Sequence, residues 1–175
     1  GATVRGIDLS QAPGDSAIAE LRQAWLEHQV INLPDQTLTP QTILALADRL
    51  GPKSDDPFLV GLADQPRVVE VRREPDEKAR IFADNWHSDW SFLPQPPSAT
   101  LLYGVEIPPV GGDTLFENLF AACAALSPQR RAELSKLTAI HSAKRSYARD
   151  GRYGESDKGR SMKITAGDSA LAAQE

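Results

Sequence analysis

Apolar and polar positions follow a helical period in the first part of the chain. Ser16 can serve as the N-cap of a helix over 17–29, because the apolar residues that follow it recur at helical spacing. The apolar stripe consists of Ile18, Leu21, Trp25 and the aliphatic part of His28. A short β-prone run over 30–33 ends at Pro34 and predicts a buried strand. We therefore expect a helix followed closely by a strand.

Cap residues predict three more helices. Thr39 and Pro40 supply an N-cap and a first-turn proline for a helix that Gly51 closes. Two later helices begin at Asn118 and at Ser127 with Pro128, the last running to about residue 137. Alternation and turn signals place short strands at 67–72, 86–92, 100–107, 113–117 and 137–141.

This mixture of short strands and peripheral helices favours an α+β protein with an antiparallel sheet or an incomplete barrel. The length of 175 residues suits a single domain over 1–175. Residues 143–175 are polar, contain glycine and carry both charge signs, so we expect them to be mobile.

Composition narrows the functional classes. The net charge of −5 argues against a nucleic-acid partner, because nucleic-acid binders usually carry a basic excess. Cys123 is the single cysteine, which favours a reducing, cytoplasmic location. No stretch approaches the roughly 18 apolar residues of a membrane span, and we expect no membrane partner.

His87 and Asp89 form the strongest candidate site. On a strand, residues two apart project to the same face, so an imidazole and a carboxylate would lie side by side. Two ligands of a 2-His-1-carboxylate site for non-haem Fe(II) would then arrive together. The three-residue pattern alone is common, and a structural hydrogen-bonded pair is the alternative.

The flanking residues carry a resemblance. The motif Asn85-Trp86-His87-Ser88-Asp89-Trp90-Ser91-Phe92 is followed by Pro96-Pro97 and by Pro108-Pro109-Val110-Gly111-Gly112-Asp113-Thr114-Leu115-Phe116. Together they resemble the Fe(II)/2-oxoglutarate-dependent dioxygenases of the taurine and aryloxyalkanoate type. The resemblance reaches upstream to Gly6-Ile7-Asp8-Leu9 and to the block from His28 to Gln36, and downstream to Ala139-Ile140-His141-Ser142.

The resemblance implies a double-stranded β-helix, or jelly-roll, core with peripheral helices. It implies Fe(II) held by His87 and Asp89, and 2-oxoglutarate bound through a carboxylate by the Thr114 hydroxyl. Gly111 and Gly112 allow the tight bend that would turn this hydroxyl toward a carboxylate, although a plain glycine turn is the alternative.

The family's second iron-binding histidine and its 2-oxoglutarate arginine lie downstream of Glu175. About six predicted strands also fall short of the roughly eight that a closed jelly roll uses. We therefore expect the chain to be the leading portion of a longer protein. Of the remaining histidines, His28 suits a helix end, and His141 is the one substitute ligand, at a position where the family has a non-ligand histidine.

Substrate selectivity is expected at Phe58, Leu59 and Ala83. Members that bind taurine present a His, a Tyr and an Asn at positions that match Asp56, Leu59 and Ala83 here. A site that lacks these hydrogen-bond donors and has Phe58 and Leu59 beside it would suit a larger apolar acid as substrate better than a small aminosulfonate. Phe58 and Leu59 as ordinary core residues are the alternative.

The main hypothesis is a dioxygenase that hydroxylates a small organic acid, aryloxyalkanoate- or sulfonate-like, with O2, while 2-oxoglutarate becomes succinate and CO2. A second hypothesis is a remnant of the same fold that binds a ligand or forms an oligomer without catalysis. A third, a zinc hydrolase that uses His87, Asp89 and His141, lacks a general base at a recognisable spacing. A homo-oligomer is compatible with each.

Overall fold

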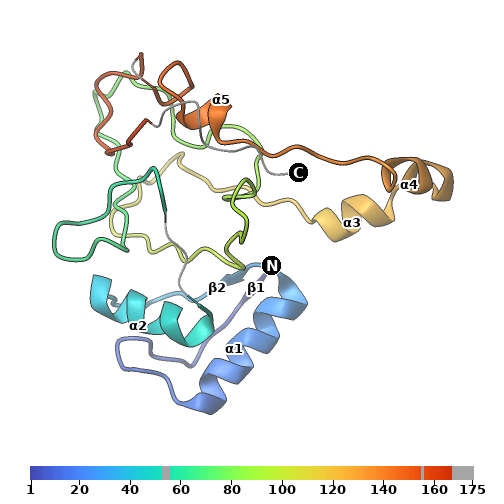
Figure 1. The fold of residues 1–175 in the computed structure, drawn as a ribbon. Helices are drawn as coiled ribbons and strands as arrows, with labels where there is room; N and C mark the ends of the chain where they lie inside the picture. The colour runs from blue at the N-terminus through green and yellow to red at the C-terminus, as the bar shows by residue number, and fades with distance from the viewer. Residues whose placement is uncertain (53–55, 155, 167–175) are drawn as a thin grey trace. The chain divides into compact units, whose positions relative to one another are not determined.

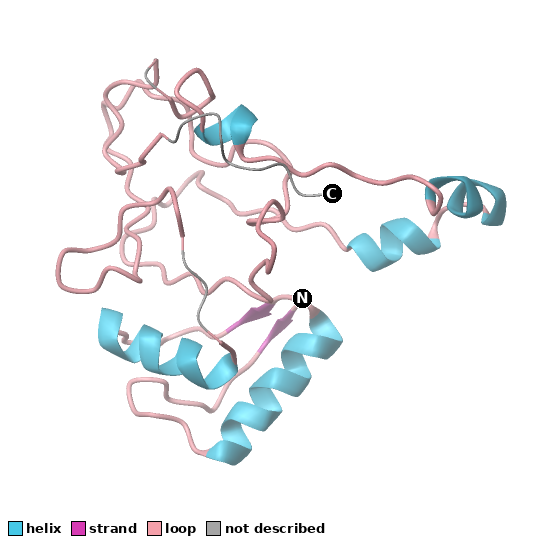
Figure 2. Cartoon of the chain, viewed as in Figure 1, coloured by secondary structure: helices cyan, strands magenta, loops and turns pink. Residues whose placement is uncertain are grey.

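The computed structural model describes residues 1–52, 56–154 and 156–166, which divide into two compact units. Unit 1 combines Gly1–Pro52 with Leu101–Thr138, and unit 2 combines Lys53–Thr100 with Ala139–Glu175. The elements are β1 (Ala2–Thr3), α1 (Asp15–His28), β2 (Ile31–Asn32), α2 (Pro40–Leu50), α3 (Leu119–Ala124), α4 (Pro128–Leu134) and α5 (Lys144–Tyr147) (Figure 1). Loops make up most of the rest (Figure 2).

The sheet of unit 1 is a short parallel pair. β1 pairs with β2 so that Ala2 lies opposite Ile31 and Thr3 opposite Asn32. Parallel neighbours need a crossover connection, and α1 supplies it between the two strands. The predicted strand over 30–33 is therefore confirmed at its centre, with a parallel partner where an antiparallel one was expected.

The core of unit 1 gathers the predicted helical stripes. Ile18 and Leu21 of α1 pack with Leu46 of α2 and with Leu9. Partly buried apolar residues surround this cluster: Val4, Ile7, Ile31, Leu33, Leu38 and Leu50. The apolar faces of the two helices thus meet, and Ile31 of β2 packs against the same cluster. None of the helices in the described residues is long and apolar enough to cross a membrane.

Polar caps begin three of the helices as predicted. The Thr39 hydroxyl accepts a hydrogen bond from the Thr42 N–H, and the Thr42 hydroxyl accepts one from the Thr39 N–H, a reciprocal capping box. Asn118 and Ser127 cap α3 and α4. The predicted Ser16 cap is wrong, because α1 begins at Asp15 and the Ser16 hydroxyl donates to Glu20 Oε1 at 3.0 Å.

The strands predicted at 67–72, 86–92, 100–107 and 113–117 do not form, and 137–141 is likewise without an extended ladder in the described residues. A strand needs a neighbouring edge to pair its backbone groups, and β-branched composition alone does not supply one. In the first of these segments the Val68 N–H donates to its near neighbour Gln65 O, a local turn bond. The expected jelly roll is accordingly not assembled by the described residues, whose one ladder is β1 with β2.

Unit 2 is built around aromatic rings, of which Tyr147 belongs to α5 and the others to loops. Phe58 is 2% exposed and stacks on Tyr147, with ring centroids 4.3 Å apart and an interplanar angle of 2°. Phe92 meets both rings edge-on, and Tyr153 contacts Tyr147 and Phe82. Such contacts stabilise a core with little regular structure, since each ring removes a large apolar area from water.

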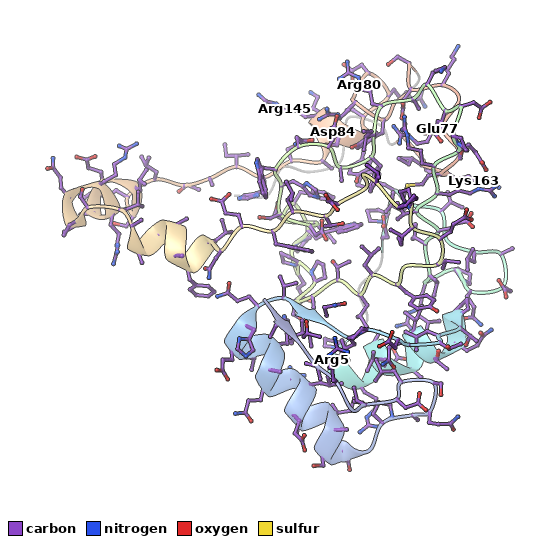
Figure 3. The ribbon with its side chains drawn as sticks, turned by 180° about the vertical axis from the view of Figure 1, so that it is seen from behind. Arg5, Glu77, Arg80, Asp84, Arg145 and Lys163 are labelled. Atoms are coloured by element: carbon purple, nitrogen blue, oxygen red, sulfur yellow. The ribbon has the colours of Figure 1, made fainter. Side chains whose placement is uncertain are left out.

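The segment expected to be mobile contributes to this core. Ala143, Ala148, Tyr153 and Met162 are all buried. The Glu77 carboxylate (Glu77 is labelled in Figure 3) accepts hydrogen bonds from the Ser161 N–H at 3.0 Å and from the Ser161 hydroxyl at 2.7 Å. Residues 155 and 167–175 lie outside the described residues, and mobility of 143–175 stays a prediction.

Gln36 joins three backbone segments of unit 1. Its Oε1 accepts from the Leu9 N–H at 2.8 Å, while its Nε2 donates to Ile7 O and to Pro34 O, both at 3.0 Å. The Gln36 carbonyl in turn accepts from the Tyr103 hydroxyl at 3.3 Å. One amide side chain therefore satisfies backbone groups that the short parallel pair leaves free.

We expect Gln36→Leu to lower the free energy of unfolding by about 1–3 kcal/mol, because Leu9 N–H and Ile7 O lose their partner in a partly buried place. Urea denaturation followed by circular dichroism measures this change. Gln23→Leu, on the exposed face of α1, is the matched control and should shift stability by less than about 0.5 kcal/mol. Equal midpoints for the two variants would contradict the bridging role.

Candidate metal centre

His87 lies in a loop and Asp89 at the start of the turn that follows, so neither lies on the predicted strand. The Leu93 N–H donates to Trp90 O at 2.9 Å, and Trp90 has a left-handed backbone with φ of 46°. The two side chains nevertheless meet, with His87 Nε2 3.1 Å from Asp89 Oδ1. The proximity predicted from the spacing is therefore confirmed, although the strand that was expected to produce it does not form.

The His87 ring has a defined tautomer. Its Nδ1 lies 2.7 Å from the Asn85 carbonyl oxygen, which can only accept a hydrogen bond, so Nδ1 carries the proton. In the neutral ring Nε2 is then a lone-pair acceptor, and it faces a carboxylate oxygen that is also an acceptor. Two acceptors at 3.1 Å attract each other only through a shared cation, either a proton or a metal ion.

Both side chains are open to solvent, with exposed fractions of 44% for His87 and 39% for Asp89. A cation can therefore reach the pair without displacing protein atoms. The other Asp89 oxygen, Oδ2, is occupied, because the Thr100 hydroxyl donates to it at 2.8 Å. One carboxylate oxygen thus faces the imidazole and the other faces the protein.

The loop that leads into His87 is held from a distant segment. Arg152 Nη1 donates to Asn85 Oδ1 at 2.6 Å, and its Nη2 pairs with Asp84 Oδ1 at 2.7 Å (Figure 3 shows Asp84). The Tyr153 hydroxyl accepts from the Ala83 N–H at 2.9 Å. Ala83 has a φ of 56°, a region that alanine seldom occupies without such support.

The turn after Asp89 is anchored in the same way. His141 Nδ1 lies 2.8 Å from the Ser91 hydroxyl. His141 therefore contacts the turn that follows Asp89. Among the described residues, no three His, Cys, Asp or Glu side chains are placed together to hold a metal ion. His28 ends α1, with its Nε2 3.9 Å from Glu27.

The remaining predicted residues have varied surroundings. Phe58 is fully buried in the aromatic core, which fits the alternative of an ordinary core residue. Leu59 is half-buried and pairs with Ile164 in an isolated bridge, and Ala83 is exposed. Thr114 belongs to unit 1, in an exposed loop after Gly111 and Gly112, whose φ values of 82° and 76° confirm the expected glycine turn.

Tyr147 is a residue that the sequence did not single out. Burial raises the pKa of its hydroxyl, and the carboxylates of Asp56 and Asp89 raise this pKa further. Tyr147 therefore stays a neutral phenol at physiological pH. Thr100, Arg152 and Tyr153 were also missed, because their partners are 11, 67 and 70 positions away and no local pattern links them.

We expect Arg152→Met to release the 83–85 loop and to shift His87 from the Nδ1–H tautomer toward the mixture of free imidazole. Long-range ¹H–¹⁵N spectra of the three histidines, recorded where imidazoles are neutral, report this ratio directly. Arg72→Met, which removes an exposed ion pair with Glu74 in the same unit, is the control and should leave the tautomer unchanged. An Nδ1–H signal that persists in Arg152→Met would rule out this anchoring role.

Comparisons with known proteins identify the family of the chain. The family described as "Taurine catabolism dioxygenase TauD, TfdA family" matches residues 1–168. The chain is 30% identical over 153 residues to the (S)-phenoxypropionate/alpha-ketoglutarate-dioxygenase of Sphingobium herbicidovorans, covering 86% of this chain and 53% of that protein. It is 32% identical over 149 residues to the alpha-ketoglutarate-dependent sulfate ester dioxygenase of Pseudomonas putida, covering 85% and 48%.

A solved structure gives the same result. A Burkholderia xenovorans protein provisionally described as an alpha-ketoglutarate-dependent taurine dioxygenase superposes with a TM-score of 0.67 at 31% identity, over 80% of this chain and 49% of that one. The chain thus spans about half the length of the relatives it matches. The resemblance found in the motifs is confirmed, and the chain belongs to the TauD/TfdA family of alpha-ketoglutarate-dependent dioxygenases.

Proposed function

We propose that the full-length protein is an Fe(II)- and 2-oxoglutarate-dependent dioxygenase that hydroxylates a small organic acid. The observation that carries this proposal is the pair of acceptor atoms, His87 Nε2 and Asp89 Oδ1, held 3.1 Å apart and open to solvent. Family membership supplies the reaction class, and the pair supplies a place in this chain where the chemistry would occur.

The donor set fits Fe(II). An imidazole nitrogen and a carboxylate oxygen are two of the three ligand types of the 2-His-1-carboxylate site. Their separation of 3.1 Å is close to the roughly 3 Å between neighbouring ligands of a six-coordinate ion with bonds of about 2.1 Å. The Nδ1–H bond to a backbone carbonyl is the usual partner of a metal-binding histidine, which fixes the ring and leaves Nε2 free.

His87 and Asp89 would hold the metal, and the rest of this chain would position them. When bound, Fe(II) together with 2-oxoglutarate supplies the activation of O2, with succinate and CO2 as co-products. Asn85 O keeps the proton on Nδ1 throughout, so that Nε2 stays available as a ligand. Thr114, in its glycine-rich turn, is proposed to donate its hydroxyl to a carboxylate of 2-oxoglutarate.

The substrate is proposed to be a carboxylate or sulfonate with a bulky apolar group. Asp56 Oδ1 accepts from the Phe58 and Leu59 N–H groups at 2.8 and 2.9 Å, so this carboxylate braces its own loop. The Ala83 N–H is likewise engaged by Tyr153. These positions therefore offer no free donor to a sulfonate, whereas the adjoining Leu59 side chain is apolar and half-exposed.

Names of relatives agree with this substrate class. One relative, 31% identical over 167 residues, is the alpha-ketoglutarate-dependent 2,4-dichlorophenoxyacetate dioxygenase of Cupriavidus pinatubonensis. The acids named for this relative and for the phenoxypropionate enzyme both carry an aromatic ether. The alternative, a non-catalytic remnant of the fold, predicts a protein that binds an organic acid without consuming 2-oxoglutarate.

We expect His87→Ala or Asp89→Ala to lower iron-dependent consumption of 2-oxoglutarate by the full-length protein at least about 100-fold, since each removes one ligand of a small set. Succinate release measures turnover, and circular dichroism checks the fold. His28→Ala and Asp64→Ala, outside the site, should retain turnover. Undiminished succinate release in either site variant would refute the iron assignment, and its absence from the wild type would favour the non-catalytic alternative.

In a panel of candidate substrates, we expect an aryloxyalkanoate or a bulky alkyl sulfonate to be hydroxylated faster than taurine by the full-length protein. The reason is the loss of free donors at Asp56 and Ala83. Substrate-dependent succinate release, normalised to release without substrate, gives the order. A clear preference for taurine would mean that the loop after α2 does not form the substrate pocket in the way proposed.

A further inference from the structure

We propose that Thr100 is a positioning residue that keeps Asp89 a one-oxygen ligand, an inference that rests on the proposed function. Thr100 lies outside the His87–Asp89 motif, 11 residues beyond Asp89. Its hydroxyl donates to Asp89 Oδ2 at 2.8 Å, while Oδ1 faces His87 Nε2 at 3.1 Å. Each oxygen of the carboxylate therefore has a different partner.

The direction of this hydrogen bond is unambiguous. An ionised carboxylate only accepts, so the Thr100 O–H must donate to it. Threonine suits the task, because its branched Cβ limits the side chain to few rotamers and thereby fixes the position of the hydroxyl oxygen. Rotation of the carboxylate that brought both oxygens toward a cation beside His87 would break this bond.

The number of open positions at the metal depends on that rotation. Three protein ligands leave three positions of a six-coordinate ion, which a two-oxygen keto acid and O2 fill. A carboxylate that bound through both oxygens would occupy one of the three. The Thr100 hydrogen bond opposes this, since a charge-assisted bond to Oδ2 is lost when Oδ2 turns away.

The same bond also limits the movement of Asp89 in a turn that lacks regular structure. Asp89 is followed by Trp90 at a φ of 46°, so no helix or sheet ladder holds its backbone. Partners of this type, one step removed from the metal, typically contribute about 10- to 100-fold in metal affinity. We therefore expect Thr100 to affect both affinity and the coordination seen by a spectroscopic probe.

Anaerobic titration of the full-length protein with Co(II) alone tests the inference, with the visible d–d absorption as the readout. We expect Thr100→Val, which keeps the shape and removes the O–H, to weaken Co(II) binding about 10- to 100-fold and to change the absorption bands. Thr100→Ser, which keeps the hydroxyl, should bind within about threefold of wild type. Thr165→Val is the matched control in the same unit and should match wild type.

The outcomes separate this inference from the proposed function. Wild-type affinity and spectrum in Thr100→Val would overturn the role of Thr100. So would weak binding in Thr100→Ser, because a packing role of the methyl group would then explain the loss. If Thr100→Val does not fold, Thr100→Ala is titrated with the same expectation. Unaltered Co(II) binding by both His87→Ala and Asp89→Ala would instead refute the metal site itself.

Discussion

The structure around the candidate site depends on one constraint, the contact between His87 Nε2 and Asp89 Oδ1. The Asn85 carbonyl fixes the proton of His87 on Nδ1, and the remaining ring nitrogen then faces the Asp89 carboxylate at 3.1 Å. In the neutral ring both atoms are acceptors, whereas a protonated Nε2 donates to Asp89; in either state the surrounding protein keeps the two side chains together. Arg152 and Tyr153 hold the approach to His87, and Thr100 with Ser91 and His141 holds Asp89 and the turn that follows.

These anchors come largely from the segment after residue 138. Its composition, polar and rich in both charges, is typical of a solvated tail. In unit 2, however, Arg152 forms an ion pair with Asp84 and donates a hydrogen bond to Asn85. The Tyr153 hydroxyl accepts a hydrogen bond from the Ala83 N–H. Because loops lack internal ladders, a site made of loops requires such long-range partners, and the segment with the least regular pattern supplies them.

Most local signals in the sequence succeeded, the Ser16 cap excepted, and signals for long-range pairing failed. Thr39 and Pro40 predicted the start of α2, and the reciprocal bonds between Thr39 and Thr42 confirm it within one turn. The spacing of His87 and Asp89 predicted their contact, but a loop carries it in place of the expected strand. Strands over 67–72 and 100–107 required partner edges that no local pattern reports. Thr100 and Arg152 could be recognised only once the chain was folded.

The positions expected to set substrate selectivity also maintain the loop structure. Asp56 accepts two backbone N–H groups of its own loop, and the Ala83 backbone is bonded to Tyr153. Phe58 is enclosed against Tyr147, whose hydroxyl stays neutral because burial raises its pKa. In such a loop the polar groups are hydrogen-bonded within the protein, and apolar surface such as that of Leu59 would remain for a ligand. Selectivity for an apolar acid would then follow from how this chain stabilises the loop, without any dedicated recognition residue.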